Sequence, residues 1–294
     1  MRASRLIVNG RQPSGGPANP EIARMFRTLN RSFIALLLSA TAAAIPATAK
    51  PPPEFDLVRV APGTFTMGTA DLDAVRFEAT EPDKLQIDDE TPAREVSITR
   101  AFWLTRTEVT QAQWLAIMDT KPGPDSHWNR PDWERLPVVS VSWDDTQAFI
   151  RTLNALPGNW RYRLPTEAEW EFAARAGSDG LRPMPLESLA GHAWYIANSG
   201  DEPQPVGTRM ANAWGFYDLL GNAWEWVADR YAPDTYRVAS QADPAGPSTG
   251  GKRVRRGGSY HCPSHLVRPG YRAADAPDTR YSVLGFRLAA DRLP

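Results

Sequence analysis

Three stretches of the chain place apolar residues on one side of a helix, and each begins with a pair of residues typical of helix starts. The pairs are Thr110 with Gln113, Ser142 with Asp145, and Thr166 with Glu169. In such a pair, each side chain satisfies a backbone N–H that the first helical turn leaves unbonded. We therefore predict helices after residues 110, 142 and 166, the last of them ending at Gly177.

Shorter apolar or alternating runs predict β-strands around these helices. The expected strands are two within 56–68 on either side of the turn Pro62-Gly63, one within 94–107, one over 137–141 and a last one over 284–290. Residues 69–92 predict an acidic surface loop, and residues 178–215 predict mostly loop. The 27 prolines and 21 glycines favour a loop-rich fold of short elements.

The composition is that of a globular protein of one or two domains, with 294 residues, 42% hydrophobic and 23% charged. A formal net charge of −1 gives no reason to expect nucleic acid or an anionic membrane surface as a partner. The single cysteine, Cys262, excludes an intramolecular disulfide framework. It also excludes a metal site built from two thiolates of this chain.

The N-terminal part of the chain reads as an export signal. Basic residues after Met25 precede an apolar run from Phe33, and Ala47-Thr48-Ala49 matches a cleavage site. We predict an N-terminal extension and signal peptide over 1–49, with Met25 as the true start, and a stiff linker over 50–55. The alternative is an uncleaved N-terminal anchor. Cleavage would leave a periplasmic or secreted domain over 56–294 with no membrane span.

The candidate chemistry lies in the run RVRRGGSYHC at 253–262. Its paired glycines, Gly257 and Gly258, allow a sharp turn or a close approach. The polar residues around the thiol are Ser259, Tyr260, His261 and, three positions after it, His265. A lone thiol in an exported protein is either buried and inert or retained for a reaction.

Several segments together resemble the formylglycine-generating enzyme (sulfatase-modifying factor) family. They are APGTFTMG at 61–68, EVT at 108–110, PVV at 137–139, RLPTEAEWE at 163–171, GNAWEW at 221–226, RGGSY at 256–260 and LGFR at 284–287. The resemblance implies an α+β domain with a modified C-type-lectin-like fold, little regular secondary structure and bound calcium. It also implies a substrate groove, and in family members two cysteines five residues apart that bind Cu(I), a metal that suits paired thiolates.

Carried over to this chain, the family pattern matches Cys262 to the first active-site cysteine, Ser259 to the active-site serine and Trp224 to a groove tryptophan. The second cysteine is expected near position 267, which is Val267. Neither of its neighbours, Leu266 and Arg268, is a cysteine. The sequence therefore describes a divergent member that lacks the second active-site cysteine.

The same resemblance implies a calcium site at Asp218, Gly221, Ala223 and Glu225. Two carboxylates and two backbone carbonyls on a tight turn give the oxygen ligands that Ca²⁺ requires. The alternative is that Asp218 and Glu225 are solvated or paired with arginines.

Two functions remain open from the sequence. One is an oxidase acting on a protein or peptide substrate through Cys262, with altered copper ligation. His265 is its better imidazole partner, since residues 261 and 262 of an extended segment point to opposite sides. A variant of this hypothesis is a periplasmic oxidase that matures a pyoverdine chromophore. The substrate-binding residues expected for the oxidase are Trp224, Tyr260, His261 and Tyr271, and the protein is expected to be a monomer. The other function is a non-catalytic binding module that binds a peptide or glycan through Trp224, Tyr260 and Tyr271, with His261 and His265 as ordinary surface residues.

Overall fold

The computed structural model describes residues 53–81, 85 and 87–294. Residues 52–294 form one compact unit, which includes the predicted domain. The predicted signal peptide and the first half of the linker, residues 50–52, lie outside the described residues. No helix in the described part of the chain has the length and apolar character needed to cross a bilayer.

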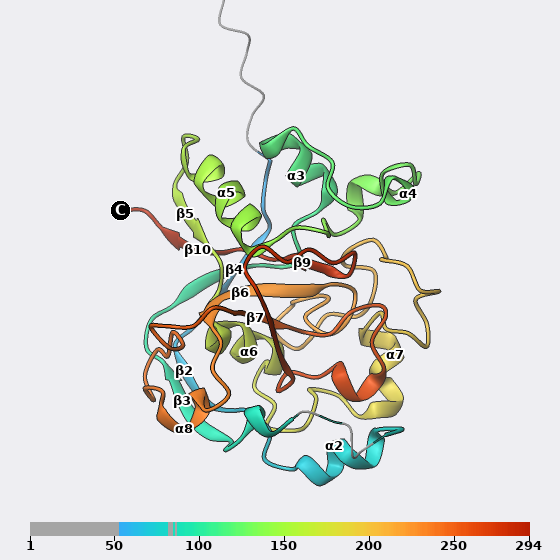
Figure 1. Ribbon diagram of the computed structural model, residues 1–294. Coiled ribbons are helices and arrows are strands. Elements are labelled where there is room, and N and C mark those ends of the chain that lie inside the picture. Colours follow the sequence, from blue (N-terminus) through green and yellow to red (C-terminus); the bar gives the residue numbers. More distant parts are fainter. Residues whose placement is uncertain (1–52, 82–84, 86) are drawn as a thin grey trace, which may run out of the picture. The chain divides into compact units, whose positions relative to one another are not determined.

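Among the described residues, ten short strands form three sheets (Figure 1). The first sheet has the order β1-β4-β10-β5, formed by Leu57–Val60, Phe102–Thr105, Ala289–Arg292 and Trp160–Arg163. The second pairs β2 (Gly63–Met67) with β3 (Arg94–Ile98). The third has the order β8-β7-β6-β9, formed by Arg272–Asp275, Arg253–Arg256, Trp224–Arg230 and Leu284–Phe286. The mixture of sheets and short helices confirms the expected α+β fold with modest regular structure.

The three predicted helices are present, and each begins with a complete capping box. They are α3 (Gln111–Met118), α5 (Trp143–Asn154) and α6 (Glu167–Arg175). The shorter helices are α2 (Leu72–Glu78), α4 (Asp125–Trp128), α7 (Leu189–His192) and α8 (Thr235–Val238). The 3₁₀ turns are η2 (Asp88–Glu90), η3 (Trp133–Arg135), η4 (Leu186–Ser188) and η5 (Ser264–Leu266).

Two hydrophobic cores lie on opposite faces of the central strand β6. On one face, Trp226 packs with Phe149 of α5 and Phe286 of β9. On the other face, Val227 packs in a core that includes Trp170 of α6. In Figure 1, α3 and α5 accordingly lie on one side of β6 and β7, and α6 lies on the other. Because successive strand residues point to opposite faces, β6 holds both cores together.

Three strand predictions need correction. Residues 94–107 form two strands, β3 and β4, which belong to different sheets. Residues 137–141 are not a strand: apart from one bridge between Thr110 and Pro137, they run through the interior without a sheet partner. The run over 284–290 divides into β9 and β10 at Arg287, whose buried guanidinium donates to the carboxylate of Glu225.

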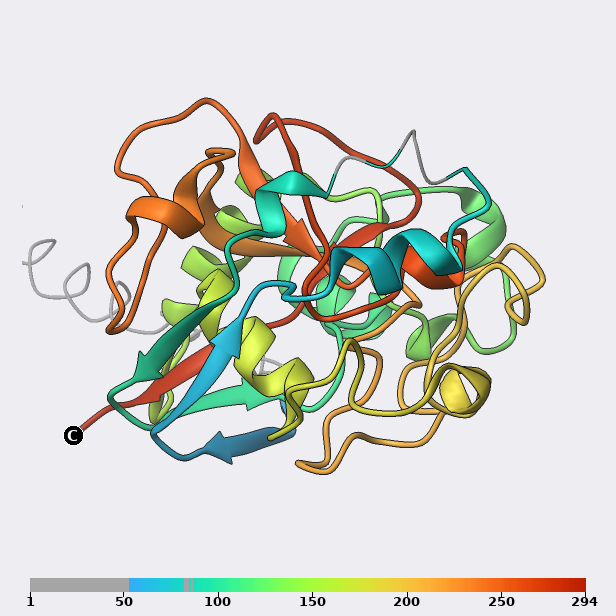
Figure 2. The same cartoon turned by 90° about the horizontal axis from the view of Figure 1, so that it is seen from below.

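Residues 69–92 are more ordered than predicted, since they contain α2 and η2. Val75 and Ile87 of this segment are buried. Figure 2, seen from below, shows α2 alongside the segment that contains η5, and the two elements are in contact. The segment 69–92 therefore packs against the residues that follow Cys262.

Candidate functional site

The segment that carries Cys262 leaves β7 through two glycines with left-handed backbone angles. Gly257 has φ 98° and Gly258 has φ 76°. The carbonyl of Gly257 accepts from the N–H of Gly221 at 3.0 Å, and the N–H of Tyr260 donates to the carbonyl of Asn222 at 2.8 Å. The GNAWEW turn therefore holds the RGGSY segment by backbone hydrogen bonds on both sides of Ser259.

Cys262 and Ser259 lie together, as the carry-over predicts. Their side chains are in contact, with 3.4 Å between Oγ of Ser259 and Sγ of Cys262. The N–H of Cys262 also donates to the carbonyl of Ser259 at 2.9 Å. Ser259 is fully buried, whereas Cys262 is half-buried. Cys262 is therefore fixed in position by Ser259 and, as a residue, is not fully buried.

Aromatic side chains surround one side of the thiol. Cys262 packs against the core that contains Trp224 and Tyr271, whose rings lie 5.6 Å apart. Burial raises the pKa of the Tyr271 hydroxyl, and the proximity of Cys262 contributes to this rise. Trp224 is buried, and the guanidinium of Arg255 stacks on it at 4.2 Å. Tyr271 is thus nearer to solvent than the predicted groove tryptophan.

The two histidines and Tyr260 point in different directions. His261 is exposed, and its Nδ1 bonds the carboxylate of Asp201. His265 lies on η5, where burial, and then the charge of Arg268, lower the pKa of its imidazole. Tyr260 is buried and donates its hydroxyl to the carbonyl of Ser282 at 3.3 Å. Within residues 53–81, 85 and 87–294, no three His, Cys, Asp or Glu side chains converge to hold a metal.

Val267, where the second cysteine was expected, is fully buried. It packs with Leu189, Ala193 and Leu220, and Cys262 contacts the same cluster. Position 267 therefore lies in the cluster against which Cys262 packs, and it offers methyl groups instead of sulfur. The side chains around Cys262 do not fit a copper centre built from two thiolates of this chain.

The residues of the predicted calcium site lie together, but Glu225 is already engaged. Its two carboxylate oxygens each accept from Arg287 at 2.7 Å, and one also accepts from the indole N–H of Trp170 at 2.7 Å. Asp218 accepts from the N–H of Gly207 at 2.7 Å through Oδ2. The arginine pairing considered for Glu225 from the sequence is thus present in the structure.

Glu108 belongs to this group, and the sequence pattern did not predict it. Its carboxyl group lies close enough to those of Asp218 and Glu225 for their charges to act on it. Burial raises the pKa of Asp218 to about 6, and burial followed by the charges of Asp218 and Glu225 raises that of Glu108 well above its usual range. Asp218 Oδ1 and Glu108 Oε2 are buried without a hydrogen-bond partner among the described residues. Two adjacent, unpartnered carboxylate oxygens fit a bound cation with oxygen ligands.

The sequence matches one family model over most of its length, and it is similar to known proteins of that family. The sequence model of the family described as "sulfatase-modifying factor enzyme 1-like domain" matches residues 41–292. The formylglycine-generating enzyme of Streptomyces coelicolor is 31% identical, over 86% of this chain and 95% of the relative. The enzyme of Bos taurus is 29% identical, over 83% of this chain and 77% of the relative.

Two solved structures are similar over the same region. PvdO from Pseudomonas aeruginosa has a TM-score of 0.68 at 29% identity, covering 82% of this chain and 99% of that chain. Treponema denticola variable protein 1 has a TM-score of 0.67 at 27% identity, covering 82% and 96%.

Proposed function

The chain belongs to the family of the sulfatase-modifying factor enzyme 1-like domain, and from this we propose that it is an exported, monomeric oxidoreductase acting on a protein or peptide-derived substrate through Cys262. One observation carries the proposal. The only thiol of the chain is half-buried and held against the hydroxyl of a fully buried serine. An inert structural cysteine is instead usually sealed among apolar side chains.

The surroundings of the thiol support binding of a substrate from one side. Tyr271 is half-buried next to Cys262, and His261 is exposed on the same segment. Tyr260 and Trp224 are buried, so their role is to hold the segment in place. Within this proposal, Tyr271 and His261 contact the substrate, while Ser259 orients the thiol.

We expect oxygen consumption when the purified protein meets a cysteine-containing peptide, and loss of this consumption in Cys262→Ser. The reason is that the chain has no other thiol to react. The matched control is the same peptide with serine in place of its cysteine, which is expected to give no uptake above buffer. Equal oxygen uptake by the wild type and by Cys262→Ser contradicts the proposal. A siderophore precursor replaces the peptide if the substrate is of the pyoverdine type.

Altered metal ligation has a separate test. Because this chain supplies one thiolate, tight Cu(I) binding at Cys262 needs a second soft ligand from the substrate. A Cu(I) competition titration is expected to show an additional bound ion when the thiol peptide is present. Cys262→Ser is expected to remove that ion. The same binding without the peptide would show that the chain itself supplies a further ligand.

The alternative is a non-catalytic binding module, and a specific observation favours it. Val267 fills the position next to Cys262 with a well-packed side chain, so the usual chemistry has no second sulfur. For this function we expect peptide binding that Tyr271→Ala weakens, with no oxygen uptake at all. The oxidoreductase and the binding module therefore differ in whether the protein consumes oxygen in the presence of the peptide.

We propose calcium as a structural ion at Asp218 and Glu108, with the backbone carbonyls of Gly221 and Ala223. Unpartnered oxygens on the first two residues support this assignment. Glu225 is held by Arg287, so it stabilises the turn whether or not it reaches the ion.

Chelation at pH 7.5 is expected to lower the melting temperature by several degrees, because it leaves two buried carboxylates side by side. Asp218→Asn is expected to abolish the chelator effect, and this is measured by thermal unfolding with and without EDTA. Exposed Asp234→Asn is the control and should keep the full effect. A wild-type melt that does not change in EDTA rules out the site.

A further inference from the structure

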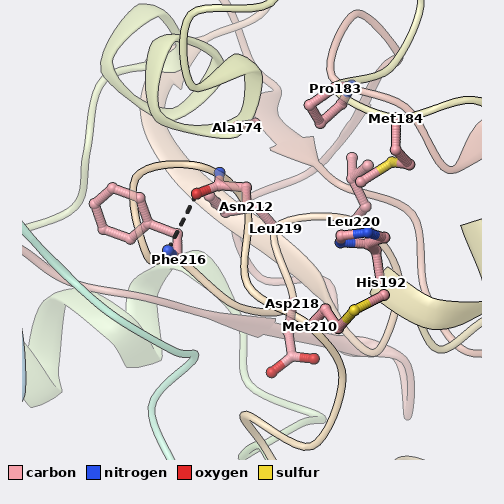
Figure 3. A pocket seen from close by; sticks show the side chains of 10 residues that line it. All are labelled: Ala174, Pro183, Met184, His192, Met210, Asn212, Phe216, Asp218, Leu219 and Leu220. Atoms are coloured by element: carbon pink, nitrogen blue, oxygen red, sulfur yellow. Dashed lines mark hydrogen bonds between the residues drawn. The ribbon is translucent and has the colours of Figure 1, made fainter.

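A small cavity of about 20 Å³ lies between α7 and the loops that carry residues 183–184 and 210–220 (Figure 3). Its lining includes apolar side chains, among them Leu219 and Leu220, and polar ones, among them Asn212 and Asp218. This volume is enough for about one water molecule or one ion of similar size. Three side chains with soft or borderline donor atoms line it, namely Met184, His192 and Met210.

The nitrogen of His192 that faces the interior has no partner. Its Nδ1 is buried without a hydrogen bond among the described residues. Figure 3 shows its imidazole between the thioether sulfurs of Met184 and Met210. The N–H of Met210 donates to the carbonyl of Gly191 at 3.0 Å, and its methyl group lies 2.7 Å from where a Cβ of Gly191 would be. Because Gly191 has no side chain, the side chain of Met210 can pack closely against this end of α7.

The oxygen groups of the cavity are less available than the sulfurs. The amide of Asn212 donates to the carbonyl of Ala173 at 2.8 Å, and its oxygen accepts from the N–H of Phe216 at 3.1 Å, the bond dashed in Figure 3. Asp218 uses Oδ2 to accept from Gly207, which leaves only its Oδ1 open. Since Asp218 is assigned to the calcium site with Glu108, the donors left to this cavity are two thioethers and one imidazole.

We propose that Met184, His192 and Met210 form a binding site for a soft monovalent metal ion, Cu(I). Thioether sulfur and imidazole nitrogen are ligands that suit Cu(I), whereas Ca²⁺ and Mg²⁺ require oxygen. Met210 is 57% exposed, which gives an ion a route from solvent.

The site is separate from the thiol and does not depend on the proposed oxidoreductase. Met184 and Cys262 contact one buried cluster, formed by Leu189, Ala193, Leu220 and Val267. Cys262 does not line the cavity, so a metal bound there does not use it as a ligand.

The test uses the full chain carrying Cys262→Ser, which removes the only thiol, and Ag(I) as a redox-inert probe for the Cu(I) site. Methionine methyl groups labelled with ¹³C report which sulfurs bind. We expect one Ag(I) per chain, with shifts of the Met184 and Met210 signals and none for Met67 or Met118. Met184→Leu, Met210→Leu and His192→Gln are each expected to weaken binding at least tenfold. Met118→Leu, on the half-buried side of α3, is the matched control and should change nothing.

Three outcomes overturn the proposal. They are no stoichiometric Ag(I) binding, shifts confined to other methionines, and an affinity that all three ligand variants leave unchanged. The last two would assign the cavity to a water bound to His192 Nδ1, with the methionines serving only as packing. Since Cys262 is absent throughout, none of these outcomes bears on the oxidoreductase.

Discussion

Replacing Gly221 with alanine is expected to destabilise the protein by about 3–5 kcal/mol, near the upper limit of single-substitution effects. Gly221 has φ 80°, which costs an alanine about 1–2 kcal/mol. A Cβ at this position would in addition overlap the carbonyl group of Trp194, with its carbon only 2.9 Å away. The backbone at 194 or 221 must therefore shift, which disturbs the hydrogen bond from Gly221 to Gly257.

Gly177→Ala separates the two effects, because Gly177 has φ 88° but no atom lies within 4 Å of the place that a Cβ would occupy. This control carries the backbone strain alone, about 1–2 kcal/mol. Urea unfolding of both variants measures the difference. Equal losses for the two substitutions would show that the close approach of Trp194 does not matter to stability.

Arg256→Met is expected to cost about 3–5 kcal/mol, because it removes one partner of a buried ion-pair network. The guanidinium of Arg256 is fully buried and donates to Glu167 at 2.7 Å and to Glu171. Burial alone would lower the pKa of the Arg256 guanidinium. Tyr236 and these two carboxylates outweigh the effect of burial and raise the pKa. Methionine fills much of the volume, so the loss reports the missing charge and hydrogen bonds of Arg256, while Glu167 keeps Arg272 and Glu171 keeps Arg175.

Arg76→Met is the matched control, since Arg76 pairs with Asp73 at 3.1 Å on the exposed surface of α2. Surface pairs of this kind contribute about 0–1 kcal/mol. Chemical unfolding in low and high salt compares the two variants. If Arg256→Met and Arg76→Met unfold at the same denaturant concentration, the buried network contributes no stability. In that case Arg256 does not anchor the segment that leads to Ser259.

The elements that depend on local chemistry were predictable from the sequence. All three capping boxes are present because they involve residues only three positions apart. The apolar run at 137–141 was misleading, because burial does not require a sheet. Val138 donates its N–H to the carbonyl of Val109, and Ser140 donates to that of Tyr281, so loops satisfy this backbone. Periodicity does not distinguish such a segment from a buried strand.

In the candidate site, too, contacts between residues close in the sequence were predictable, whereas contacts between distant residues were not. Ser259 and Cys262 are three residues apart, and their contact follows from the local turn. Glu108 lies near Asp218 although the two residues are far apart in the sequence. The sequence signal for Glu108 was a single carboxylate at the first position of the EVT motif. The pairing of Glu225 with Arg287 depends on the break between β9 and β10, which no local pattern marks. Long-range contacts thus decide which carboxylates remain free.

The central claim is that the folded protein presents the thiol of Cys262 to a substrate, and its alkylation tests this most directly. Iodoacetamide is added to the native protein, and intact mass spectrometry follows the addition of one group to the only cysteine. The half-buried thiol is expected to react without denaturant, and a cysteine-containing peptide substrate is expected to slow the reaction. Alkylation that occurs only at the rate of global unfolding would contradict the claim, because the sulfur would then be closed off in the native state.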